Sequence, residues 1–244
     1  MKKFIFASDL HGDMAEPEAV EKLLKFCEIW KPDKRIFGGD LFDFRNIRRG
    51  AGAGEKADSM QADVEAGLMF LNNFQPNVFL LGNHDKRLWD VARFNECGIV
   101  KDYARQGVKD IEKKARQLKC KIIDYKADTG YYDLGKVRML HGYCAGIMAT
   151  KKHAEIYSPA GGIALHGHTH AIHHHTIQRA GGGEGRGVGC LARLDMEYNV
   201  MHPNRITHAN GFAYGWVNGA DWEVFQARRT KGKKWVVVKE IENL

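Results

Sequence analysis

Short apolar runs alternate with amphipathic segments along the first half of the chain. The run KKFIFAS has the length of a strand and ends in the polar sequence DLHGD. Pro17 is suited to a first helical turn, and apolar residues then recur at three- and four-residue steps, so we predict an amphipathic helix over residues 17–30. The runs KRIFGGD and NVFLLGNHD predict two more strands, and apolar spacing from Met60 to Leu71 predicts a helix between them.

This βαβαβ order predicts a parallel sheet covered by helices. Further helices are expected over residues 86–97 and around the apolar stripe from Val108 to Leu118, whose other positions are largely Lys and Arg. The segment RRGAGAGE, residues 48–55, has no periodicity, and we expect a mobile loop that could act as a lid.

Strand patterns dominate from Lys121 onward, and a turn is expected at the glycine-rich residues 180–187. No segment between the two halves resembles a flexible linker. We therefore predict one domain over residues 1–244, of the α/β class, with two packed sheets and helices outside. The expected strands of this half are KIIDY, GYYDL, VRMLHGY, GGIALHGHTH, AIHHHTIQ, GVGCLARL, FAYGWV, WEVFQARR and KWVVVKEI.

The composition is that of an ordinary soluble protein: 44% of the 244 residues are hydrophobic and 27% are charged. No apolar stretch is long enough to cross a bilayer, so we expect no membrane association. Five scattered cysteines without metal-type spacing predict reduced core thiols and a cytoplasmic location. The net charge of +7 favours anionic partners such as nucleic acid or phosphorylated small molecules, although it also serves solubility alone.

Acids, histidines and an amide recur directly after predicted strands. Because loops at the carboxyl ends of strands converge in an open α/β sheet, we expect them to form one polynuclear site. Mixed oxygen and nitrogen ligands without thiolate favour Mn, Fe, Zn, Co or Ni over calcium or a structural zinc. The segments are DLH at 9–11, GGDLFD at 38–43, GNHD at 82–85, LHGY at 140–143 and GHTH at 167–170.

Spacing within these segments suggests how ions are held. Asp9 and His11 are two residues apart, as are His168 and His170, so each pair points to one side if its backbone is extended. Two metals about 3.5 to 4 Å apart share a ligand, and a carboxylate is best able to bridge them. Asp40 is the candidate bridge.

The order Asp-x-His, Gly-Asp-x-x-Asp, Gly-Asn-His-Asp, His, Gly-His-x-His resembles the calcineurin-like metallophosphoesterases, and in particular their small phage and prophage members. The resemblance implies a four-layer α/β/β/α sandwich of two mixed sheets flanked by helices. It also implies two divalent ions, with manganese first and Fe, Zn, Co or Ni as alternatives. By this resemblance one ion is held by Asp9, His11, Asp40 and His170, and the other by Asp40, Asn83, His141 and His168.

The same resemblance assigns catalytic roles to two residues. His84 protonates the leaving oxygen, and Asp43 orients His84 from behind. Asp85 is expected to cap the following helix rather than assist His84. The cluster at residues 173–175 lies on an apparent strand whose alternation prevents all three histidines from reaching one metal, so we place it at the rim or surface.

The predicted function is hydrolysis of phosphomonoesters or phosphodiesters by a hydroxide that bridges two metals. Phe44 stands where protein phosphatases of the family have arginine, which argues against that activity. The substrate stays open among phosphorylated small molecules, nucleotides and nucleic acid, as does the oligomeric state. A nuclease is the alternative, favoured by basic residues and by the aromatic residues of the segment 212–222. A non-catalytic, metal-braced binding module is the rival from another class.

Overall fold

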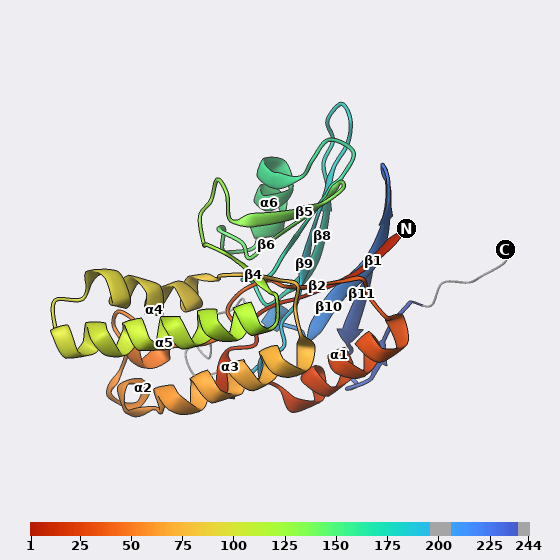
Figure 1. Ribbon diagram of the computed structural model, residues 1–244. Coiled ribbons are helices and arrows are strands. Elements are labelled where there is room, and N and C mark those ends of the chain that lie inside the picture. The colour runs from red at the N-terminus through yellow and green to blue at the C-terminus, as the bar shows by residue number, and fades with distance from the viewer. Residues whose placement is uncertain (196–205, 239–244) are drawn as a thin grey trace.

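The computed structural model describes residues 1–195 and 206–238, and its helices and strands are arranged as Figure 1 shows. The helices, including two short 3₁₀ turns, are η1 (Gly12–Met14), α1 (Pro17–Trp30), η2 (Arg45–Ile47), α2 (Ala53–Ala57), α3 (Met60–Phe74), α4 (Asn83–Phe94), α5 (Gly98–Gln117) and α6 (Ala149–Tyr157). The strands are β1 (Lys2–Ala7), β2 (Lys34–Phe37), β3 (Val78–Leu80), β4 (Lys121–Ile123), β5 (Tyr131–Leu134), β6 (Val137–Leu140), β7 (Ile163–His166), β8 (Ile172–Thr176), β9 (Glu184–Val188), β10 (Gly211–Asn218), β11 (Asp221–Arg229) and β12 (Trp235–Val236).

The first sheet has seven strands in the order β12-β11-β10-β1-β2-β3-β4. Strands β1 to β4 are parallel to one another, which confirms the parallel sheet expected from the βαβαβ order. Strands β10 to β12 extend the sheet on the other side of β1 with antiparallel pairing.

The second sheet has five strands in the order β5-β6-β7-β9-β8. Its central pairs β6–β7 and β7–β9 are parallel, whereas β5 and β8 run antiparallel to their neighbours. Both sheets are therefore mixed.

The two faces of the first sheet bury different side chains. Phe4 and Phe6 of β1 pack toward the second sheet, together with Met139 and Leu165. Ile5, between them, faces the other way into the cluster formed with α1, α3, α4 and α5. Helix α6 covers the far face of the second sheet, and Figure 1 shows it on the opposite side from α1, α3, α4 and α5. The layers are helix, sheet, sheet and helix, which confirms the predicted α/β/β/α sandwich.

The helix expected over residues 17–30 is α1 and has these bounds. The other expected helices begin or end at different residues in the structure. Helix α4 begins at Asn83, three residues early, because Asp85 accepts a hydrogen bond from the backbone N–H of Gly82 at 2.8 Å and closes the first turn. This is the capping role expected of Asp85. Helix α6 was not expected, since polar residues stand on its buried face and the periodic pattern is weak.

Four other expectations are wrong in detail. Residues 48–55 are not wholly irregular, because α2 begins at residue 53, where Glu55 accepts from the backbone N–H of Gly52. The glycine-rich segment 180–187 contains the start of β9, and GVGCLARL is strand only to Val188. Cys97 is exposed and is not a core thiol. The end of KWVVVKEI, residues 239–241, lies outside the described residues.

Within the described ranges, none of the helices combines the length and the apolar composition that crossing a bilayer requires.

Candidate metal centre

The five polar segments meet at one edge, where strands of both sheets end. The loops after β1, β2 and β3 bring their residues from the first sheet, and the loops after β6 and β7 bring theirs from the second. Backbone bonds join neighbouring loops: the N–H of Asp9 donates to Gly39 O at 2.9 Å, and the N–H of His11 donates to Asp40 O at 3.0 Å. The carboxylate of Asp9 accepts the N–H of His168 at 3.0 Å, which ties the two sheets together at the site.

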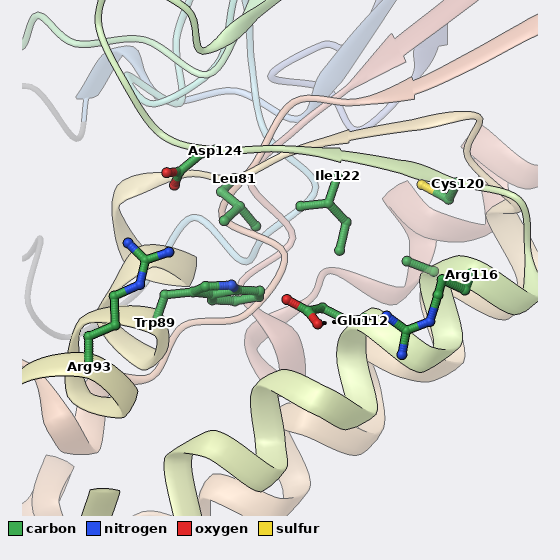
Figure 2. A pocket seen from close by; sticks show the side chains of 9 residues that line it. Leu81, Trp89, Arg93, Glu112, Arg116, Cys120, Ile122 and Asp124 are labelled. Atoms are coloured by element: carbon green, nitrogen blue, oxygen red, sulfur yellow. Dashed lines mark ion pairs between the residues drawn. The ribbon is translucent and has the colours of Figure 1, made fainter.

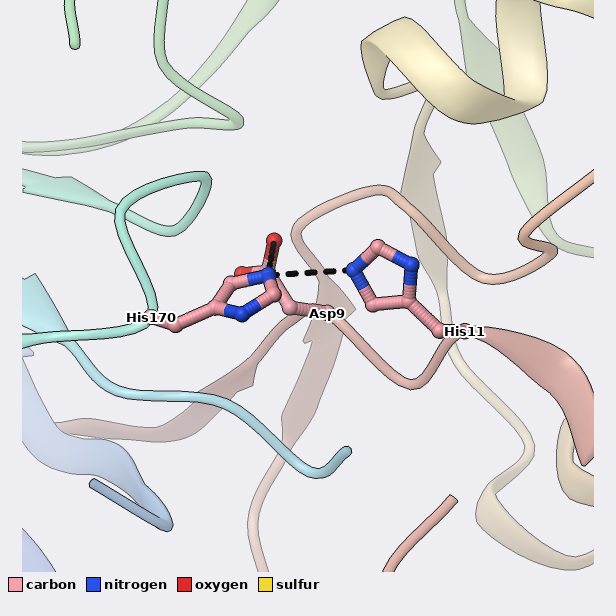
Figure 3. A group of neighbouring side chains, drawn as sticks. All are labelled: Asp9, His11 and His170. Carbon is pink, nitrogen blue, oxygen red and sulfur yellow. Dashed lines mark hydrogen bonds and ion pairs between the residues drawn. The ribbon is translucent and has the colours of Figure 1, made fainter. Parts of the chain in front are cut away.

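The first ligand group consists of Asp9, His11 and His170, whose donor atoms lie within 4.8 Å of one another (Figure 3). The Nε2 atom of His170 is 3.0 Å from Nε2 of His11 and 3.3 Å from Oδ1 of Asp9. All three residues are buried.

The second ligand group consists of Asp40, His141 and His168, again within 4.8 Å. Oδ2 of Asp40 lies 3.3 Å from Nε2 of His141 and 3.9 Å from Nε2 of His11, so one carboxylate oxygen faces both groups. Oδ1 of Asn83 is 3.0 Å from Nε2 of His141. The structure thus brings together all seven side chains expected to ligate metal.

The tautomers of two histidines fit a metal. Nδ1 of His141 is 2.8 Å from Gly38 O, which can only accept, so Nδ1 carries a proton and Nε2 is the atom that would bind a metal once its own proton is displaced. Nδ1 of His11 is 3.0 Å from the carboxylate of Asp43, which fixes the same tautomer. Nε2 of His11 faces Nε2 of His170 in a buried site, and a cation that displaces the proton between them would bind both nitrogens. The residues present therefore fit divalent ions.

Buried carboxylates set the charge of the site. Burial lowers the pKa of His11, but the hydrogen bond and charge of Asp43 outweigh it and raise the pKa to about 9. Burial also lowers the pKa of His141, but the charge of Asp40 outweighs this and raises the pKa to about 9. The surrounding histidines keep the pKa of Asp40 well below its usual range, although burial opposes this. The cluster is a site of negative potential that attracts cations.

His84 stands beside these groups with 13% of its side chain exposed. Its Nδ1 is 2.7 Å from Oδ1 of Asp43, so Nδ1–H donates and Nε2 faces the site, 3.9 Å from Oδ2 of Asp40. The same Oδ1 of Asp43 also accepts from His11, a contact that the family resemblance did not include. Asp43 therefore orients two histidines at once. Burial lowers the pKa of His84.

Two carboxylates that support the site escaped the sequence analysis in this role. Asp63 on α3 accepts the N–H groups of Asp43 and Phe44 at 3.0 and 2.7 Å. Asp85 accepts the N–H of Phe42 at 3.0 Å, so the loop after β2 is held from both sides. A sequence signal for Asp63 existed, because an acid on the buried face of an amphipathic helix needs partners.

Replacing Asp63 with asparagine should lower the free energy of unfolding by about 1 to 3 kcal/mol, because an amide accepts only one of the two buried N–H groups. Urea unfolding of the metal-free protein measures this. Asp110→Asn, at an exposed position of α5, is the control and should change stability by less than about 0.5 kcal/mol. Equal effects of the two substitutions would contradict the assigned role of Asp63.

The backbone of the site loops is left-handed rather than extended. The φ angles are 59° at Asp9, 55° at His11, 64° at His168 and 52° at His170, so the expectation of extended pairs is wrong. His168 and His170 belong to different ligand groups, whereas Asp9 and His11 share the first group, as their spacing suggested. Gly82 allows the close approach of two loops, since a Cβ there would lie 2.1 Å from Oδ1 of Asp40.

Other histidines lie around this centre. Residues 173–175 are on β8, where His174 is exposed and 2.9 Å from Glu184, in agreement with the predicted surface position. The ring of His208 lies 5.1 Å from that of His170, a neighbour that the sequence did not indicate.

Comparison with known proteins gives one family and a set of related folds. The family model described as calcineurin-like phosphoesterase matches residues 2–239. No curated protein matches the chain. Vps29 from Chaetomium thermophilum has a TM-score of 0.52 at 9% identity, over 97% of this chain and 93% of that chain. At this identity the likeness concerns the fold alone.

Two further solved structures have lower scores. Vacuolar protein sorting 29 from Cryptosporidium parvum has a TM-score of 0.49 at 12% identity, with 97% of this chain and 95% of that chain covered. Yfce, a phosphoesterase from E. coli, has a TM-score of 0.42 at 15% identity, with 91% and 96% covered.

Proposed function

Because the chain belongs to the calcineurin-like phosphoesterase family, we propose that it hydrolyses phosphoesters with two divalent ions bound between its sheets. The family supports a metal-dependent phosphoesterase, and the two ions and their ligands are our proposal. Asp9, His11 and His170 would hold one ion, and Asn83, His141 and His168 the other, with Asp40 shared.

The observation that carries this proposal is the position of Asp40. Its Oδ2 faces histidines of both ligand groups, while its Oδ1 accepts the backbone N–H of His84 at 2.8 Å. One buried carboxylate is thus fixed by the residue proposed as the acid and is free to bridge. When bound, the ions would polarise the phosphate and activate the attacking water.

The residues of the chain do the remaining work. Asp43 holds the proton of His84 on Nδ1, so Nε2 is the atom that delivers a proton to the leaving oxygen. The carboxylate of Asp43 also stabilises the imidazolium form of His84 that this delivery requires. His84 lies in a third candidate ligand group with His11 and Asp40, but the two proposed ions have their ligands without it, which leaves His84 for the acid role and supports catalysis over a metal-braced module.

A nuclease remains a form of the same proposal, with one argument weakened. Phe212 and Tyr214 are 1% exposed and belong to the core between α1 and the first sheet, so only Trp216 and Trp222 of the aromatic segment are open to stacking. The nuclease alternative is also supported by basic residues elsewhere in the chain.

Turnover of chromogenic esters tests the function. Protein stripped with a chelator and refilled with Mn²⁺, Zn²⁺ or Co²⁺ is given p-nitrophenyl phosphate and bis-p-nitrophenyl phosphate, and metal per chain is measured in parallel. We expect turnover that requires metal and two ions per chain. Metal binding without turnover on esters, nucleotides, DNA or RNA would favour the module.

A further inference from the structure

A groove runs between α4 and α5, next to β4 at the edge of the first sheet (Figure 2). Its inner hollow of about 330 Å³ is lined by Leu81, Trp89 and Asp124 among others. Its outer hollow of about 730 Å³ shares Trp89 and adds Lys109. We call the two together the hairpin groove. Their sizes are in the range of ligand sites.

The hairpin groove has an excess of positive charge. Its lining contains two acids, Glu112 and Asp124, and both are already paired, with Arg116 at 3.8 Å and Lys126 at 3.5 Å. Four lining residues are cationic, namely Arg93, Arg105, Lys109 and Arg116. Arg93 and Lys109 are exposed, and neither makes an ion pair or side-chain hydrogen bond within the described part of the chain. These two cations are available to an anion.

An aromatic ring forms the floor. Trp89 lines both hollows, is 8% exposed and packs against the core cluster, so its ring is held rigidly. Figure 2 shows the ring below Leu81 and to the left of Glu112, which pairs with Arg116. A fixed tryptophan beside unpaired cations is the combination that binds a base and its phosphate.

The length of the groove favours a strand over a single nucleotide. Arg105, Lys109 and Arg116 are spaced at four and seven residues, share one face of α5 and span about 17 Å. Neighbouring nucleotides even in a duplex strand are about 3.4 Å apart, so this length exceeds that of one nucleotide. The helices α4 and α5 that border the groove also expose two aromatic residues, Phe94 (75% exposed) and Tyr103 (59% exposed).

The inner end of the groove adjoins the metal centre. Leu81 is two residues before Asn83, and α4 carries both His84 in its first turn and Trp89 further along. Asp124 precedes Tyr125, whose ring meets that of His141 edge-on at 5.7 Å. Residues that line the groove therefore neighbour residues of the metal centre along the chain.

We propose that the hairpin groove binds a segment of single-stranded nucleic acid, with a base on Trp89 and phosphates at Arg93 and Lys109. The inference names the substrate class of the proposed phosphoesterase and rests on that function for the reaction. The binding itself needs no turnover.

Fluorescence anisotropy with a labelled dodecathymidylate, in chelator so that no strand is cut, tests the binding. Arg93→Ala and Lys109→Ala should each weaken binding about threefold to tenfold, and Lys109→Ala should reduce the salt slope by about one. Arg228→Ala is the matched control, because Arg228 is exposed on β11 near the other edge of the sheet. It should leave binding unchanged.

Trp89→Leu should weaken binding about tenfold while Trp89→Phe retains most of it, because a base stacks on either aromatic ring. Thermal unfolding shows which variants are folded. If the Trp89 variants do not fold, the variants of the exposed Arg93 and Lys109 still test the binding.

Three results would overturn the inference: equal weakening by the Arg93, Lys109 and Arg228 variants, equal competition by inorganic polyphosphate, or competition by thymidine monophosphate as effective as by the dodecamer. Chromogenic esters are too small to need the groove. Turnover without strand binding would thus refute the groove alone, and strand binding without turnover would refute the phosphoesterase alone.

Discussion

Replacing Asp40 with asparagine should lower metal affinity more than about 100-fold and reduce turnover to background. Substituting the outer partners of a metal site typically costs about 10- to 100-fold in affinity, and Asp40 would contact both ions directly. Asparagine keeps Oδ1 as the acceptor for the N–H of His84. It places an NH₂ group where Oδ2 of Asp40 faces both ligand groups. Metal per chain after dialysis, and ester turnover, are the measurements.

The control for this substitution is Asp128→Asn, at an exposed turn position where only Thr129 is bonded. It should retain metal and activity. Circular dichroism of the metal-free Asp40 variant establishes that the fold persists. Two tightly bound ions in a folded Asp40→Asn protein would refute the shared-ligand role.

The second large effect is expected at His84. His84→Ala should reduce kcat about 10²- to 10⁴-fold for an alkyl phosphoester, whose leaving oxygen needs a proton. The loss should be much smaller for a p-nitrophenyl ester, since a stable phenolate leaves without one. Metal content should be unchanged, because His84 is outside the proposed ligand sets. The ratio of the two kcat losses measures the acid role.

His174→Ala is the matched control, because His174 is an exposed histidine paired with Glu184 on β8. It should leave both esters unaffected. An equal loss of kcat on both esters for His84→Ala would show that the side chain acts through metal or substrate binding and not as an acid.

The pattern of apolar and polar residues was sufficient to predict the layers, because the burial of each face determines where apolar residues stand in the sequence. In β1, alternate residues face the helices and the second sheet, and both faces are apolar, so the run is continuous. Helix α6 escaped because its buried face mixes two alanines with the polar Thr150 and His153, so it contrasts little with the polar face. In the structure this helix is held by packing against the second sheet, which no pattern within residues 149–157 reveals.

The segments of the site could be identified from the sequence because each follows a strand, and the family resemblance named their residues, but the local geometry could not be predicted. Extended spacing put His168 and His170 on one side, whereas left-handed backbone at both residues turns them to different groups. The role of Asp63 depends on a contact between α3 and the loop after β2, 20 residues apart. No local pattern encodes such a contact.

The left-handed backbone also bears on engineering the protein for heat resistance. Each non-glycine residue in this conformation costs about 1 to 2 kcal/mol, and Asp9, His11, Asp40, His168 and His170 all adopt it. A screen that rewards thermostability alone would select glycine at these five positions, and each such gain would delete a proposed ligand. Selection for stability has to exclude them or be coupled to an assay of metal retention.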